Sequence, residues 1–155
     1  MFVIITSLIV SNNILRRAFE EGIKVSPMKL QKLLYLLYAR YLYETKGIPL
    51  FSSRFEVWQY GPVLPEIYFH FREFKAEPID KYALVGNETL AVKENNEVFK
   101  KAIDLVWKRY KYKTENSLSE LTHKQDTAWY KADSRNERFL LDDEIIEDGE
   151  FFFES

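Results

Sequence analysis

The chain contains no cysteine, and only five glycines and five prolines occur among its 155 residues. Without cysteine, neither a disulfide framework nor a thiolate metal site can form, and such a composition fits a reducing cytoplasm. The glycines are scattered, so there is no glycine-rich phosphate-binding loop, and no Gly-x-Ser-x-Gly nucleophile elbow occurs. The sequence therefore lacks the common signatures of nucleotide-binding proteins and serine hydrolases.

Long apolar runs and a strong net charge are also missing. The first ten residues are mostly apolar, but polar and basic side chains follow within residues 12–17, which leaves the segment too short to span a bilayer. The segment also lacks the basic region and the small-residue cleavage site of a signal peptide. The net charge of −2 argues against bulk electrostatic affinity for nucleic acid. We therefore expect a cytoplasmic protein with no membrane partner, and nucleic acid is disfavoured as a partner.

Aromatic residues are abundant instead: 12 Phe, 10 Tyr and 3 Trp make up 16% of the chain. A chain of this length buries roughly two-thirds of the surface that its unfolded form exposes, which predicts one domain over residues 1–155. A small core does not easily hide so many rings. The two histidines, His70 and His123, have no ligand-like spacing, and we predict neither a metal site nor a cofactor.

Hydrophobic periodicity predicts a mainly α, compact helical bundle. The second expected helix is the clearest, because Ser26 can cap it, Pro27 suits its first turn, and leucines recur every three or four residues. This helix should be central and covered on two sides. The other helices are expected over about 6–21, 65–74, 96–110 and 128–132, with a short one opening at Leu118 after a capping box of Ser117 and Glu120.

Two further segments carry predictions. Gly86 and Asn87 stand between two short apolar runs, which predicts a small β-hairpin at about residues 82–92. Residues 55–60 also alternate in character, so a short strand is an alternative there. The C-terminal residues 142–155 are acidic, and we expect a solvated tail whose phenylalanines pack onto the domain; docking onto a basic partner is the alternative.

A rigid corner is expected where a glycine and two prolines follow an aromatic loop. Gly61 permits backbone shapes that other residues resist, whereas Pro62 and Pro65 fix the chain at the start of a helix. A fixed corner that displays Trp58 and Tyr60 is a good place for a binding hot spot. The alternative is that both rings simply cover the core beside the second helix.

Three residues further along the chain are open to the same two interpretations. Thr122, His123 and Trp129 either line the same groove as the corner, or Trp129 anchors the C-terminal helices and His123 caps a helix end. Ser119 and His123 would be neighbours on one helix, with Asp126 close by, but this coincidence is common. We therefore predict that the protein is not an enzyme.

A basic stretch at residues 93–113 holds seven Lys or Arg against three acidic residues. It could contact nucleic-acid phosphates, which leaves a nucleic-acid-binding regulator as an alternative function. The favoured interpretation is the solvated face of a helix.

Four blocks, in this order and spacing, closely resemble the Panacea-domain family, small bacterial and phage proteins that include GepA-like and SocA-like members. The blocks are Lys-Leu-Gln-Lys-Leu-Leu-Tyr at 29–35, the segment 55–68 with Tyr-Gly-Pro-Val-Leu-Pro-Glu-Ile-Tyr at its end, Leu-Ser-Glu-Leu-Thr-His at 118–123 and Ala-Trp-Tyr-Lys-Ala at 128–132. The resemblance covers about residues 6–150. Ala128 departs from the family, which usually has proline before that tryptophan, and residues 125–127 depart as well.

The resemblance implies a helical antitoxin that binds a cognate protein toxin and blocks it by direct contact, without chemistry of its own. A SocA-like member would instead act as an adaptor that delivers its toxin to a cytoplasmic protease, and a phage-borne gene could serve in counter-defence. The expected partner-binding residues are Trp58, Tyr60, Gly61, Pro62, Pro65, Tyr68, Thr122, His123 and Trp129.

Overall fold

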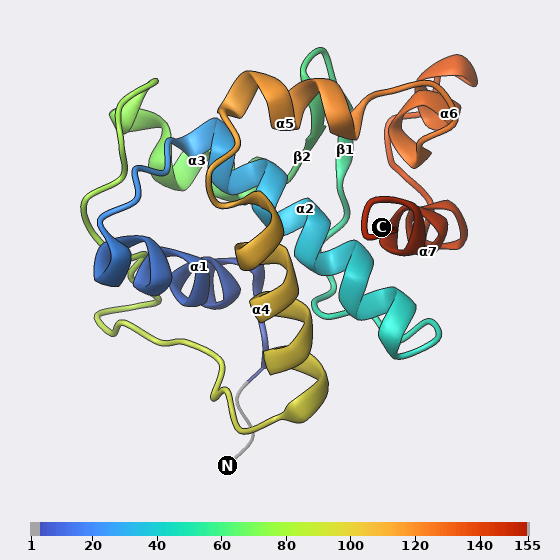
Figure 1. Ribbon diagram of the computed structural model, residues 1–155. Helices are drawn as coiled ribbons and strands as arrows, with labels where there is room; N and C mark the ends of the chain where they lie inside the picture. Colours follow the sequence, from blue (N-terminus) through green and yellow to red (C-terminus); the bar gives the residue numbers. More distant parts are fainter. Residues whose placement is uncertain (1–3, 155) are drawn as a thin grey trace.

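The computed structural model describes residues 4–154, which form seven α-helices and a small two-stranded antiparallel sheet (Figure 1). The predicted mainly helical fold with one small hairpin is confirmed. The first three residues of the apolar start lie outside the described part of the chain. No helix within residues 4–154 is long and apolar enough to cross a membrane.

The first two helices begin where their capping residues predict. Helix α1 (Ser7–Glu21) is capped by the hydroxyl of Thr6, which accepts a hydrogen bond from a backbone N–H of the first turn. Helix α2 (Pro27–Glu44) is capped in the same way by Ser26 and has Pro27 in its first turn. Local sequence alone therefore sets the start of both helices.

Helix α2 forms the centre of the molecule. It contacts α1, α3, α4, α5, α7 and the second strand, and every residue from 29 to 39 is buried. Figure 1 shows α2 running through the middle of the fold, with helices on both sides. The prediction of a central, covered helix is confirmed, and even Lys29, Gln31 and Lys32 of α2 are buried.

Helix α4 (Glu97–Tyr110) is capped by Asn96. Its side chains Phe99, Ile103 and Val106 face the core, whereas Val98 is exposed. This helix packs against α2, as α1 does.

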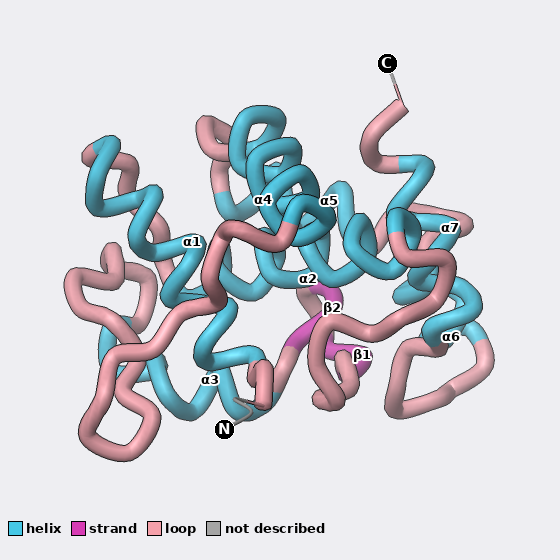
Figure 2. Tube along the Cα trace, turned by 90° about the horizontal axis from the view of Figure 1, so that it is seen from below, coloured by secondary structure: helices cyan, strands magenta, loops and turns pink. Residues whose placement is uncertain are grey.

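The hairpin lies at the aromatic loop rather than at residues 82–92. Strands β1 (Glu56–Trp58) and β2 (Gly61–Val63) pair in antiparallel register and lie between α3 and α6 in both ribbon views (Figures 1 and 2). The segment 82–92 keeps only a single bridge, between Val85 and Glu88.

Two asparagines of α1 explain why the predicted hairpin does not form. The side chains of Asn12 and Asn13 hydrogen-bond the backbone of residues 83, 90 and 92, so these groups are not available for a ladder. Because both asparagines lie more than seventy residues away in sequence, the local turn chemistry could not reveal this competition.

The short helices differ from prediction in detail. Helix α3 (Pro65–Phe71) continues into a 3₁₀ turn, η1 (Arg72–Phe74), and leaves Tyr68 exposed. Helix α5 (Glu115–Thr122) begins three residues before the predicted start because Thr114, not Ser117, caps it. Helix α6 (Ala128–Ser134) forms where expected.

The acidic C-terminal segment is a docked helix, not a solvated tail. Helix α7 (Asp142–Phe151) packs closely on α2, because a Cβ at Gly149 would lie only 2.1 Å from the carbonyl oxygen of Ala39. The carboxylate of Asp148 is buried and accepts hydrogen bonds from the hydroxyl of Tyr35 and the backbone N–H of Ala128. The tail prediction is therefore wrong, although Phe152 does pack onto the core as expected.

Candidate functional site

The backbone of residues 58–64 is held by side chains from three different helices. The carbonyl of every second residue accepts one hydrogen bond from a donor on α2, α5 or α6. The pairs are Trp129 Nε1 with Trp58 O at 2.8 Å, Ser119 Oγ with Tyr60 O, Lys32 Nζ with Pro62 O at 2.9 Å, and Gln31 Nε2 with Leu64 O at 2.9 Å. The backbone N–H of Leu64 donates back to Gln31 Oε1 at 2.9 Å.

These donors come from the other three sequence blocks, so the four blocks together build one corner. Removing such a donor would leave a buried carbonyl without a partner and lower the free energy of unfolding by about 1–3 kcal/mol. Each of these hydrogen bonds therefore restrains the hairpin. The sequence predicted a rigid corner from its glycine and prolines. It did not predict that the side chains of Gln31, Lys32 and Ser119 form hydrogen bonds with the backbone of the corner.

Gly61 has a φ of +120° and lies directly against two of the supporting helices. A Cβ at this position would lie 3.0 Å from Thr122 Oγ1 and 3.1 Å from Lys32 Nζ. Thr122 is fully buried, and its hydroxyl donates to the carbonyl of Leu118. Gly61, Pro62 and Thr122 thus lie behind the surface of the corner rather than on it.

Four aromatic side chains face outward from the corner and from α3, and we call them the aromatic patch: Trp58, Tyr60, Tyr68 and Phe69. Tyr60, Tyr68 and Phe69 are 57%, 44% and 58% exposed. The ring of Tyr68 lies 5.1 Å from that of Trp58 and 5.4 Å from that of Phe69, centroid to centroid. Trp58 is half-buried, and its indole N–H donates to Glu56 Oε1 at 3.1 Å. The patch is therefore a group of neighbouring rings on a fixed backbone.

A groove of about 500 Å³ borders the aromatic patch. Its walls come from the first turns of α2, from the hairpin and from α3 with the residues after it. Three basic side chains line this groove, Lys32, Arg72 and Lys75, and no acidic residue does. Burial lowers the pKa of Lys32 to about 7, since the apolar surroundings disfavour its charged form.

His123 and Trp129 sit at the edge of the corner. Trp129 is buried, and its indole N–H donates to the backbone carbonyl of Trp58 in the hairpin. His123 is the C-cap of α5, and its ring packs against Trp129 at 5.2 Å. Within residues 4–154, its buried Nδ1 has no hydrogen-bond partner.

Within residues 4–154, Ser119, His123 and Asp126 are not joined by hydrogen bonds to one another. The hydroxyl of Ser119 donates to the hairpin, and no hydrogen bond links it to His123 among the described residues. Asp126 is exposed in the turn that follows. Over the same part of the chain, no three His, Asp or Glu side chains are grouped so that they could hold a metal ion.

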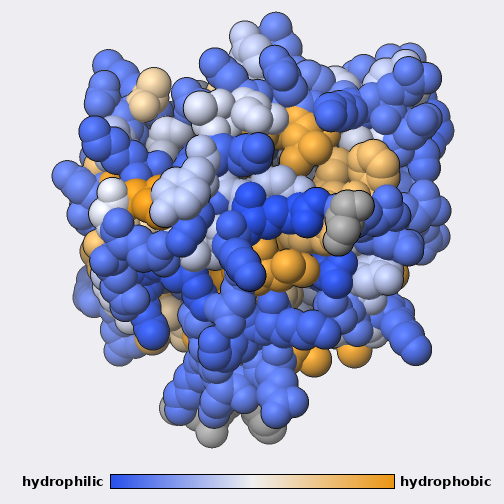
Figure 3. All heavy atoms as spheres, viewed as in Figure 1, coloured by the Kyte–Doolittle hydropathy of each residue, from blue (hydrophilic) through white to orange (hydrophobic). Residues whose placement is uncertain are grey.

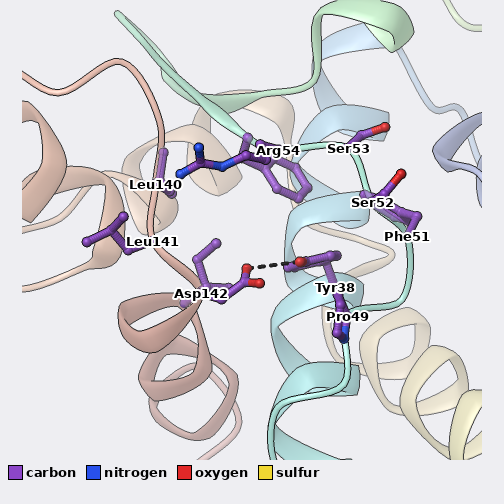
Figure 4. A pocket seen from close by; sticks show the side chains of 11 residues that line it. Tyr38, Pro49, Phe51, Ser52, Ser53, Arg54, Leu140, Leu141 and Asp142 are labelled. Carbon is purple, nitrogen blue, oxygen red and sulfur yellow. Dashed lines mark hydrogen bonds between the residues drawn. The ribbon is translucent and has the colours of Figure 1, made fainter.

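A second hollow, of about 370 Å³, lies where the loop after α2 meets the start of α7 (Figure 4). The hydroxyl of Tyr38 donates to Asp142 Oδ1 at 2.9 Å across it, and burial together with this carboxylate raises the pKa of Tyr38. The guanidinium of Arg54 lies over the ring of Phe139. The first contact links α2 to α7, and the second links the loop after α2 to the segment before α7, so we assign the hollow a structural role.

Comparisons with known proteins agree with the resemblance of the four blocks. The family described as "Antitoxin SocA-like, Panacea domain" matches residues 30–130. Antitoxin SocA of Caulobacter vibrioides (strain NA1000 / CB15N) is 44% identical over 59 residues, which are 38% of this chain. The match spans 31% of that relative, about a third of its length. No solved structure matches the chain.

Proposed function

The chain belongs to the SocA-like Panacea-domain antitoxin family, and from this premise we propose that it neutralises a partner protein toxin by direct contact. Membership supports an antitoxin role and implies a cognate toxin. The finer proposal is that the aromatic patch is the surface that binds the toxin.

The observation that carries this proposal is the exposure of Tyr60, Tyr68 and Phe69 on and beside a corner whose backbone is held by four side-chain donors. Tyrosine and tryptophan dominate the binding energy of protein interfaces because they bury much area and lose little rotamer freedom. A corner that is already fixed loses little further entropy on binding. In this proposal Trp58, Tyr60 and Tyr68 touch the toxin.

The other predicted site residues take a supporting role in the proposal. Gly61, Pro62 and Pro65 shape the corner, and Thr122 and Trp129 hold it from behind. His123 lies beside Trp129 at the margin of the contact surface. Because neutralisation by contact requires no bond to be made or broken, we propose a non-enzymatic function.

A growth assay with co-purification tests the proposal. The neighbouring gene of the native locus is expressed under tight control, with either the wild-type chain, Tyr60→Ala/Tyr68→Ala, or the control Tyr112→Ala/Tyr130→Ala. All four tyrosines are exposed, so both double variants are expected to fold. We expect the wild type and the control to relieve toxicity and co-elute with the toxin. The patch variant should bind about 100-fold more weakly.

Two further results refine or contradict the proposal. A constant toxin level during rescue indicates masking, whereas a falling level that depends on a protease indicates delivery by an adaptor. Full rescue by a folded Tyr60→Ala/Tyr68→Ala variant would show that the toxin binds elsewhere.

A further inference from the structure

The charge of the groove differs from that of the rest of the molecule. The chain has more acidic than basic residues, 24 against 22, yet the groove is lined by Lys32, Arg72 and Lys75 without any carboxylate. No Asp or Glu among residues 4–154 forms an ion pair with any of the three. By contrast, other cations such as Arg17, Arg40 and Arg135 are paired within the fold.

The positive charge of Lys32 is not needed to build the corner. Its side chain is 1% exposed, and its ammonium donates one hydrogen bond, to the carbonyl of Pro62. Gln31, the preceding residue, clamps the hairpin with a neutral amide through two hydrogen bonds. An amide bonds a carbonyl without the penalty of burying a charge, so a lysine has no structural advantage here. A carboxylate arriving from outside would favour the charged form of Lys32.

Apart from Gln31 and Gln59, the remaining walls of the groove are apolar or aromatic. Met28 and Val63 line it together with the rings of Trp58, Tyr60 and Tyr68. A hollow of about 500 Å³ accepts a few side chains rather than a folded surface. An apolar side chain would be buried there, while carboxylates on either side of it would meet the cations.

We propose that the groove binds a segment of the partner protein that carries carboxylates next to an aromatic or aliphatic side chain. This inference rests on the proposed function, since it describes the part of the toxin that the aromatic patch and groove recognise. An acidic protein segment fits better than nucleic acid, because the groove offers apolar surface for a side chain beside its basic residues.

Peptide display on the purified full chain tests the proposal even while the toxin is unidentified. Random twelve-residue peptides are selected on the wild type, and the enriched ones are synthesised with a fluorescent label. We expect them to be net negative, with at least one aromatic or aliphatic residue next to an acidic one. They should bind about tenfold more weakly to Arg72→Gln/Lys75→Gln, since two rim charges are lost, and more weakly again at high salt.

Lys101→Gln/Lys108→Gln is the matched control, because it removes two exposed α4 cations that line no part of the groove. It should leave peptide affinity unchanged. The proposal is overturned if no peptide is enriched, if the enriched peptides are neutral or basic, if they bind the groove variant as well as the wild type, or if a single-stranded oligonucleotide displaces them at lower concentration.

The growth assay separates this inference from the proposed function. The wild type and Arg72→Gln/Lys75→Gln could relieve toxicity equally and bind the toxin with equal affinity. That result would support the antitoxin function and reject the proposal that the groove binds an acidic segment of the toxin. Alternatively, acidic peptides could bind in a manner that requires Arg72 and Lys75 while the neighbouring gene is not toxic. That result would support the proposed chemistry of the groove and reject the pairing with a toxin from the neighbouring gene.

Discussion

At the scale of single residues, glycine is favoured at position 61 for two reasons, its backbone conformation and its closely packed neighbours. Its φ of +120° is unfavourable for any side chain, and a Cβ would crowd Thr122 Oγ1 and Lys32 Nζ. We expect Gly61→Ala to lower the free energy of unfolding by about 2–4 kcal/mol, as backbone strain and crowding add. Urea unfolding monitored by circular dichroism measures this loss.

Gly47 offers a control in which the strain occurs without the crowding. Its φ is +116°, and nothing lies within 4 Å of the position that a Cβ would take. Gly47→Ala should therefore lower the free energy of unfolding by only about 1–2 kcal/mol. Equal losses in the two variants would show that Lys32 and Thr122 move aside freely, and the corner would be less rigid than we infer.

At the scale of elements, Asp148 joins three helices through one buried carboxylate. It lies on α7 and accepts hydrogen bonds from Tyr35 of α2 and from the first backbone N–H of α6. Burial raises the pKa of Asp148 from its ordinary 3.8 to about 6, in spite of these donors. The junction of the three helices should therefore depend on pH.

The direction of this dependence follows from proton binding. Between about pH 4 and 6 the folded protein holds a proton on Asp148 that the unfolded chain has released, so this group's contribution to stability falls as the pH rises. Relative to Asp148→Asn, the wild type should lose about 2–3 kcal/mol in free energy of unfolding across that range. Urea titrations at several pH values measure the difference.

Asp143→Asn, an exposed change on the same helix, is the control and should show no such trend. A wild type that instead gains stability over Asp148→Asn as the pH rises would mean that the hydrogen bonds of Asp148 outweigh its burial.

The starts of α1, α2 and α4 were predictable because their causes are local. Thr6, Ser26 and Asn96 each cap a helix within three residues of their own position. The misplaced hairpin and the docked tail have distant causes instead. Asn12 bonds backbone some seventy residues later, and Asp148 meets Tyr35 more than one hundred residues away. No pattern within a short window of sequence contains such pairs.

The structural corner was predictable in position but not in detail. The sequence indicated the Trp58–Pro65 corner from its glycine, prolines and rings. It did not show that Thr122 is buried, because a helix of eight residues has too few turns to define its inward face. Lys32 was missed as well, although a lysine within a leucine stripe is itself unusual and raises the question of what it pairs with.

At the scale of the whole molecule, charges of both signs are interspersed. Within the basic stretch, Lys100 pairs with Asp104 at 2.7 Å and Lys111 with Glu21 at 2.8 Å. The face that carries α4 and α5 is mostly hydrophilic, with only separate hydrophobic patches (Figure 3). Ion pairs within the fold reduce the field that the stretch of seven basic residues would otherwise project.

This charge pattern predicts that the protein binds nucleic acid only weakly and without sequence specificity. We expect no binding of labelled DNA or RNA duplexes of about 20 base pairs at roughly 150 mM salt in fluorescence anisotropy, and at most weak binding at about 50 mM. Phosphate binding requires several free cations on one surface, and paired lysines do not release counterions from the duplex. Tight binding that falls steeply with salt and is weakened by Lys101→Gln/Lys108→Gln would contradict this prediction. In that case α4 would be a nucleic-acid surface, and the regulator that the basic stretch suggested would become the better function for this chain.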